Sequence, residues 1–207
     1  MSGTAPLPFR NSPSPMTDWL PFLLAVLALL ATPGPTNTLV AAAGAGRGVA
    51  ASLPLLLGEL GGYAVAITLW TEVVGAAAAT QPAVLTLSKV IAAAFLVWSA
   101  VKLWRAAGTE NLSGNGITVS RVFMTTLLNP KALVLAFGIF PAVGFVGRLP
   151  YLAVFGGLVV VTAVGWMAFG ALLRRSSKGQ LTLRTVDRAA AGVLVVFAVL
   201  IGASALG

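Results

Sequence analysis

Two charged side chains, Glu59 and Lys131, stand inside long apolar stretches of the sequence. An ionisable residue at the centre of a membrane-spanning helix costs about 2.5–3.5 kcal/mol on insertion scales, so each should face the protein interior and have a partner. A buried carboxylate can titrate or bind an ammonium group, and a buried lysine can bind a carboxylate. We predict that Glu59 and Lys131 lie near one another or share a cavity. The alternatives are a structural ion pair and, for Lys131, a side chain that extends to the membrane interface.

Proline interrupts two of the apolar stretches. The first interruption reads Thr-Pro-Gly-Pro-Thr-Asn at 32–37, and the second reads Leu-Asn-Pro-Lys at 128–131. Because proline lacks a backbone N–H, the carbonyls of Leu29, Ala31 and Thr126 are expected to lose their helical partners. Such broken backbone is tolerated at membrane depth only inside the protein or beside a water-filled cavity.

A half-helix is expected to restart after each interruption. Asn129 is a favourable N-cap for a helix that begins at Pro130. The start of a helix exposes backbone N–H groups and a partial positive charge, which suits a carboxylate ligand. The two interruptions therefore predict a substrate site near the middle of the membrane.

The composition identifies the class of protein. Of the 207 residues, 58% are apolar and only 9% are charged, whereas about 25% are charged in an ordinary soluble domain. The chain has no Cys and no His, which excludes thiol chemistry, His-ligated metals and Ser–His catalysis. We expect an all-α integral membrane protein that is not an enzyme and has no metal site or cofactor. We expect the protein to be embedded in the lipid bilayer, and we expect no nucleic-acid partner.

Six transmembrane segments are predicted from the apolar runs. Their approximate bounds are 19–46, 49–72, 83–104, 121–145, 149–173 and 189–207. Nine Lys and Arg residues fall after segments one, three and five, and at most three fall on the opposite side. The positive-inside rule therefore places both termini outside the cytoplasm. The net charge of +8 is explained by these basic cytoplasmic loops.

The two interruptions recur at a regular distance. Pro33 and Pro130 are 97 residues apart, and the sequence that opens with Lys89 resembles that opening with Arg188 at an offset of 99. Two units of three helices, at about 16–107 and 118–207, are necessarily inverted because three is odd. Inverted repeats with paired broken helices are typical of secondary transporters. Two independent proline kinks are the alternative interpretation.

A proline-rich segment precedes the first apolar run. Residues 1–15 contain four prolines with Ser and Asn, so we expect a disordered extension followed by a single membrane domain at 16–207. The apolar run after it is too long for a signal peptide. Translation from Met16 rather than Met1 is left open.

Two further features concern segment two. Gly58 and Gly62 form a Gly-x-x-x-Gly spacing that allows a close approach of helices. Glu72 lies near the outer end of this segment, and we expect it to be solvated.

With these residues in view, the sequence resembles the lysine exporter (LysE/RhtB) translocator family. The resemblance rests on Thr-Pro-Gly-Pro at 32–35, on the glycines at 44–48 and in segment two, on FLVWSAVKLWR at 95–105, and on FMTTLLNPK at 123–131, which is followed by Pro141. It covers about residues 16–207.

The resemblance implies export of amino acids or close derivatives from the bacterial cytoplasm across the inner membrane, coupled to the proton gradient. Glu59 departs from the family's expected small or apolar residue and suggests a cationic or zwitterionic substrate. The alternatives are an exporter of a small ion or metal and a non-transporting membrane scaffold; a homodimer is also possible. The candidate substrate-binding residues are Pro33, Gly34, Pro35, Asn37, Glu59, Asn129, Pro130 and Lys131.

Overall fold

The computed structural model describes residues 19–105, 107, 116–141, 143–174, 179–203 and 205. The predicted extension at 1–15, the start at Met16 and most of the linker between the predicted repeats lie outside these residues. The described residues are helical, without strands, as predicted for the fold class. The elements are α1 (Trp19–Ala31), α2 (Pro35–Arg47), α3 (Val49–Ser52), α4 (Leu55–Thr68), η1 (Leu69–Val74), α5 (Gly75–Thr80), α6 (Pro82–Arg105), α7 (Val119–Leu127), α8 (Pro130–Val134), η2 (Leu135–Ile139), α9 (Phe145–Leu173) and α10 (Gly179–Ala203).

Both predicted interruptions are present as bends between helices. The axes of α1 and α2 differ by 62°, and those of α7 and the Pro130–Ile139 helix differ by 47°. Each following helix begins with proline in its first turn, where the missing N–H removes no helical hydrogen bond. The predicted cap is confirmed, because the Asn129 side chain accepts a hydrogen bond of 3.0 Å from the backbone N–H of Lys131.

The helices differ in how well their lengths match a membrane. The helices Leu55–Ala77, Thr86–Arg105 and Phe145–Leu173 are each long and apolar enough to cross it. The count of candidate spans rises to five when each bent pair is taken as one. The apolar portion of α10, Ala191–Ala203, is shorter than a span. Six spans and an inverted repeat therefore remain predictions.

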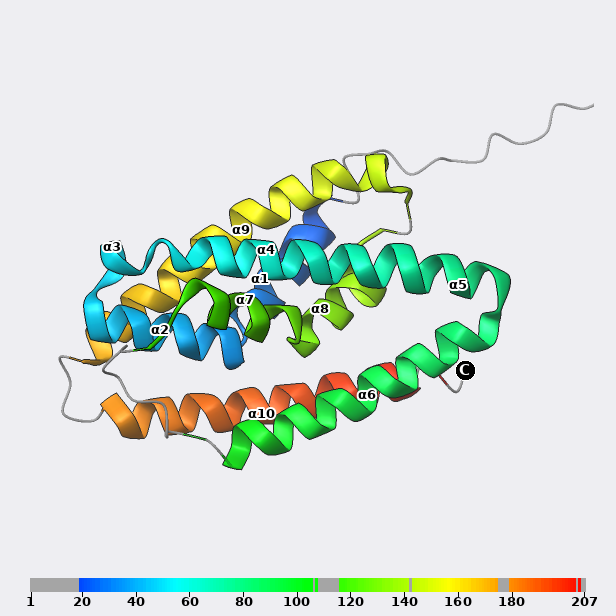
Figure 1. Ribbon diagram of the computed structural model, residues 1–207. Helices are drawn as coiled ribbons and strands as arrows, with labels where there is room; N and C mark the ends of the chain where they lie inside the picture. Colours follow the sequence, from blue (N-terminus) through cyan, green and yellow to red (C-terminus); the bar gives the residue numbers. More distant parts are fainter. Residues whose placement is uncertain are drawn as a thin grey trace, which may run out of the picture.

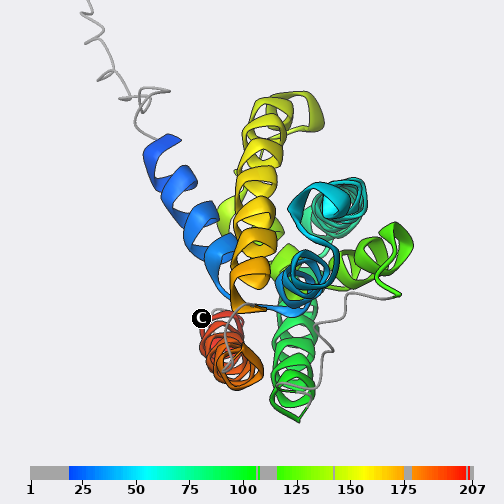
Figure 2. The same cartoon turned by 90° about the vertical axis from the view of Figure 1, so that its left-hand side faces the viewer.

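The helices form two groups (Figures 1 and 2). In both views α6 and α10 lie side by side along one flank, and α1, α2, α4, α7, α8 and α9 make up the larger body. The α6–α10 pair has a small buried cluster of its own, formed by Leu96, Ala100, Ala191, Leu194 and Ala198. This pair is a separate packing unit laid against the broken helices.

Glycine allows the closest helix contacts within the larger body. The predicted Gly58–Gly62 spacing belongs to α4 and packs against α7, as a packing role requires. A Cβ atom built on Gly62 would lie 2.7 Å from Cβ of Thr126 and 2.8 Å from the carbonyl oxygen of Phe123. Gly44 of α2 and Gly170 of α9 approach the opposite backbone even more closely, at Met167 and Ala41. Four glycines thus bring the main helix pairs together.

We expect Gly62→Ala to destabilise the protein by about 1–3 kcal/mol, since the added methyl group overpacks the contact between α4 and α7. The measurement is the midpoint of thermal unfolding in detergent. Gly157→Ala in α9 is the matched control, because its Cβ would meet no atom within 4 Å. Equal midpoints for the two variants would contradict the close packing.

Candidate substrate-binding site

The two helix breaks contact each other through buried polar side chains. The hydroxyl oxygens of Thr36 and Thr126 are 3.2 Å apart, and Nδ2 of Asn129 donates a 3.0 Å hydrogen bond to the Thr36 hydroxyl. All three side chains are buried. Residues about ninety positions apart in the sequence therefore form one polar cluster. We call this cluster and Lys131 the junction; its members are Thr36, Thr126, Asn129 and Lys131.

Lys131 joins the second break to the first. Its Nζ donates a hydrogen bond to the carbonyl oxygen of Thr32, and the side chain is only 1% exposed. A Cβ atom built on Gly34 would lie 3.1 Å from Cε of Lys131 and 3.4 Å from Nζ. Gly34 has an extended backbone that any residue could adopt, so the absence of a side chain is what leaves room for the lysine.

Asn37 has a structural role at the first break. Its Nδ2 donates hydrogen bonds of 2.9 Å to the carbonyl oxygens of both Leu30 and Thr32. Unpaired carbonyls at this depth are costly, so the amide stabilises the end of α1. The sequence pointed to Leu29 and Ala31 as the carbonyls freed by proline. The extended backbone at Gly34 also ends the helix, which leaves the neighbouring carbonyls of Leu30 and Thr32 without helical partners. The Asn37 amide donates to these two carbonyls.

Glu59 is buried on α4 but is not ion-paired with Lys131. The side chain is 2% exposed, and no ion pair joins it to Lys131 within 4 Å in the described structure. Each charge nevertheless lies within the electric field of the other. Oε2 of Glu59 and the hydroxyl of Tyr63 are both buried without a hydrogen-bond partner among the described residues. Tyr63 was missed from sequence, although its position one turn after Glu59 places both on one helix face.

Two cavities lie against the broken helices, at different heights along α6. The first, the Lys102 cavity, has a volume of about 390 Å³, and the second, the Lys89 cavity, has about 490 Å³. The Lys102 cavity is lined by Pro35, Thr38, Leu39, Phe95, Trp98, Ser99, Lys102, Leu103, Arg121, Met124, Thr125, Leu128, Asn129 and Pro130. The Lys89 cavity is lined by Ala25, Ala28, Leu29, Thr32, Lys89, Val134, Phe137, Gly138, Ile139, Val193, Phe197, Leu200 and Ile201.

Residues at or beside the helix breaks line both cavities. Pro35, Asn129 and Pro130 reach the Lys102 cavity, and Thr32 reaches the Lys89 cavity. The other predicted site residues line neither of them: Pro33, Gly34, Asn37 and Lys131 belong to the breaks, and Glu59 lies behind them on α4. The two cavities share no lining residue, and each is lined in part by residues of the helix breaks.

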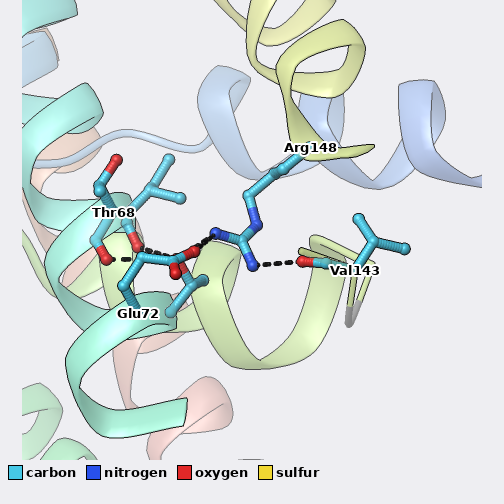
Figure 3. Close-up of polar contacts among 6 residues, drawn as sticks. Thr68, Glu72, Val143 and Arg148 are labelled. Atoms are coloured by element: carbon cyan, nitrogen blue, oxygen red, sulfur yellow. Dashed lines mark hydrogen bonds and ion pairs between the residues drawn. The ribbon is translucent and has the colours of Figure 1, made fainter. Parts of the chain in front are cut away.

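Glu72 is exposed, as expected, but it also has an ion-pair partner. The buried guanidinium of Arg148 donates to the Glu72 carboxylate, to the Thr71 hydroxyl at 2.7 Å and to the Val143 carbonyl at 2.6 Å. Figure 3 shows Arg148 reaching from α9 to Glu72 and Val143. Arg148 falls between the predicted segments 121–145 and 149–173, so a loop position was expected. In the structure α9 begins earlier, at Phe145, and Arg148 lies against the π-helical turn η1. This cluster joins η1 to the start of α9.

The fold and the junction define a helical membrane protein with two broken helices in contact. The model of the LysE type translocator family matches residues 27–204, and the chain belongs to this family. Its members are transporters. The chain is also similar to an uncharacterized membrane protein of Vibrio cholerae serotype O1, with 30% identity over 129 residues. That match spans 59% of this chain and 63% of the relative. No solved structure matches the chain significantly.

We expect Asn37→Ala to lower the stability by about 1–3 kcal/mol, because two buried carbonyls lose their donor. The measurement is again thermal unfolding in detergent. Thr162→Val is the control, since its hydroxyl bonds only to the carbonyl of Leu158 in its own helix. A control as destabilised as Asn37→Ala would show that the break is not specially supported by this amide.

Proposed function

We propose that the chain is a secondary active exporter that moves amino acids or close derivatives out of the bacterial cytoplasm, coupled to the proton gradient. The observation that carries this proposal is the junction, which joins two broken helices that each reach a cavity. In the proposed cycle the junction is the barrier between the two cavities, as alternating access requires. The basic loops support an orientation in which the Lys102 cavity faces the cytoplasm and both termini lie outside.

In this mechanism the substrate opens the barrier by replacing a protein hydrogen bond. Lys131 donates to the Thr32 carbonyl, which also accepts from Asn37. A substrate carboxylate is a stronger acceptor for an ammonium group than a carbonyl is. When it takes the place of Thr32, the link between the two breaks is released and α1–α2 can move relative to α7–α8. The N-terminus of α2 adds a partial positive charge beside the same position.

Glu59 is the candidate site for the coupled proton. It is a buried carboxylate with an unpartnered oxygen, on a helix that packs against the second break, and it lies in the field of Lys131. Protonation removes its negative charge and so changes how strongly Lys131 is held. This links the occupancy of a proton to the state of the barrier without direct contact between proton and substrate.

Lys131→Met is expected to lower transport roughly ten- to a hundredfold, because a charged hydrogen bond contributes about 1.5–3 kcal/mol. The variant should still insert in the membrane. The measurement is the amino-acid profile exported by cells fed with dipeptides, which load the cytoplasm with amino acids. Arg105→Met, at the exposed end of α6, is the control. Wild-type export by Lys131→Met at normal membrane abundance would refute the proposed role.

Glu59→Gln is expected to uncouple substrate transport from proton movement. The amide keeps the shape of the side chain but cannot carry the charge change. In proteoliposomes, exchange of substrate at equal pH on both sides should persist, whereas accumulation driven by a pH gradient should be lost. Gradient-driven accumulation at the wild-type level would show that the proton binds elsewhere.

A further inference from the structure

Arg148 joins three segments of the chain through one side chain. Its guanidinium donates to the carboxylate of Glu72 and to the hydroxyl of Thr71 at 2.7 Å, both in η1, and to the carbonyl oxygen of Val143 at 2.6 Å (Figure 3). The Thr71 hydroxyl in turn donates to the carbonyl oxygen of Ile67 at 2.7 Å, which fixes its orientation. We call these contacts of Arg148 the Arg148 clasp. The clasp fastens η1 and α9 to the segment that follows η2.

The segment held in this way continues from a wall of the Lys89 cavity. The η2 residues 137–139 line that cavity, and Val143 follows shortly after them in the sequence. η1 and η2 are in contact, and the ring centroids of Trp70 and Phe137 lie 6.1 Å apart. Both segments are π-helical, a rare geometry that frequently occurs at functional sites. The Arg148 clasp therefore lies where it can hold the η2 wall of the cavity in place.

The clasp has one buried and one exposed member. The Arg148 side chain is 6% exposed, whereas the Glu72 side chain is 45% exposed. Removing one partner of a buried ion pair leaves an uncompensated charge, which is costly. The guanidinium escapes this cost by moving towards water, and in doing so it gives up its hydrogen bonds to Thr71 and Val143. Loss of the Glu72 carboxylate is therefore expected to release all three segments together.

We infer that Arg148 is a positioning residue that holds η2 against η1 and so fixes one wall of the Lys89 cavity. Release of the clasp lets η2 move away from α1, which contacts η2 and contributes Ala25 and Ala28 to the same cavity. Water then enters the cavity beside α1. The inference goes beyond the proposed function, because it concerns the movement of one cavity wall and its test measures no transport.

The accessibility of single cysteines tests the clasp, since the chain has no Cys of its own. Ala28→Cys places a thiol in the lining of the Lys89 cavity, and Ser99→Cys places one in the lining of the Lys102 cavity. The measurement is the rate at which a charged methanethiosulfonate reagent labels each thiol in the full chain in detergent. When the open form is a minor species, this rate follows its population.

Glu72→Ala should raise the labelling rate at Ala28→Cys about two- to fivefold, the range that a partly exposed ion pair allows, and should leave the rate at Ser99→Cys unchanged. Arg174→Met is the matched control, because Arg174 follows the opposite end of α9 and donates to two carbonyls of α2. It should leave labelling at Ala28→Cys at the parent rate. Glu72→Gln, which keeps an acceptor for Arg148 but removes the charge, is the second variant and should give a smaller rise at the same thiol.

Three results would overturn the inference. The first is an unchanged rate at Ala28→Cys in both Glu72 variants. The second is an equal rise at Ser99→Cys, and the third is an equal rise at Ala28→Cys in Arg174→Met, since either would show a general loosening of the helices. None of these results depends on which solute the protein moves, so the proposed function is tested separately.

Discussion

The structure depends on satisfying the backbone groups that the two helix breaks leave unpaired within the membrane. At this depth no bulk water can replace a lost helical partner. The protein supplies partners from side chains instead: Asn37 for the end of α1, and the side chain of Asn129 for the start of α8. Lys131 then adds a hydrogen bond from the second break to the first. Each break is therefore stabilised by an amide side chain of its own and by a hydrogen bond to the other break.

Close packing around the junction holds two helix pairs together, α4 with α7 and α2 with α9. Glycines bring α4 onto α7 and α2 onto α9 at distances that no side chain would allow. The α6–α10 pair, with its own small core, lies against this body, and both cavities include residues of α6.

The two acidic residues of α4 and η1 show why burial cannot be inferred from residue type. Glu59 and Glu72 are chemically alike and lie more than three turns apart on one continuous helix. Glu59 is buried, with no partner for Oε2 among the described residues, whereas Glu72 binds Arg148 at the start of α9. The difference arises from the helix that packs beside each of them. Tyr63 likewise became a candidate only from the structure, because its hydroxyl is buried one turn from Glu59 with no hydrogen-bond partner in the described part of the chain.

The sequence alone determined the helical membrane class, the positions of both breaks, the Asn129 cap, the glycine contact and the family, because these depend on composition, on proline and glycine geometry, and on short local motifs. The tertiary structure alone decided that the breaks touch, that Asn37 supports backbone, that Lys131 binds Thr32 rather than Glu59, and that Arg148 holds Glu72. These contacts join residues that are up to 99 positions apart, or they depend on how the helices pack. No local pattern specifies the rotation and depth at which two helices meet.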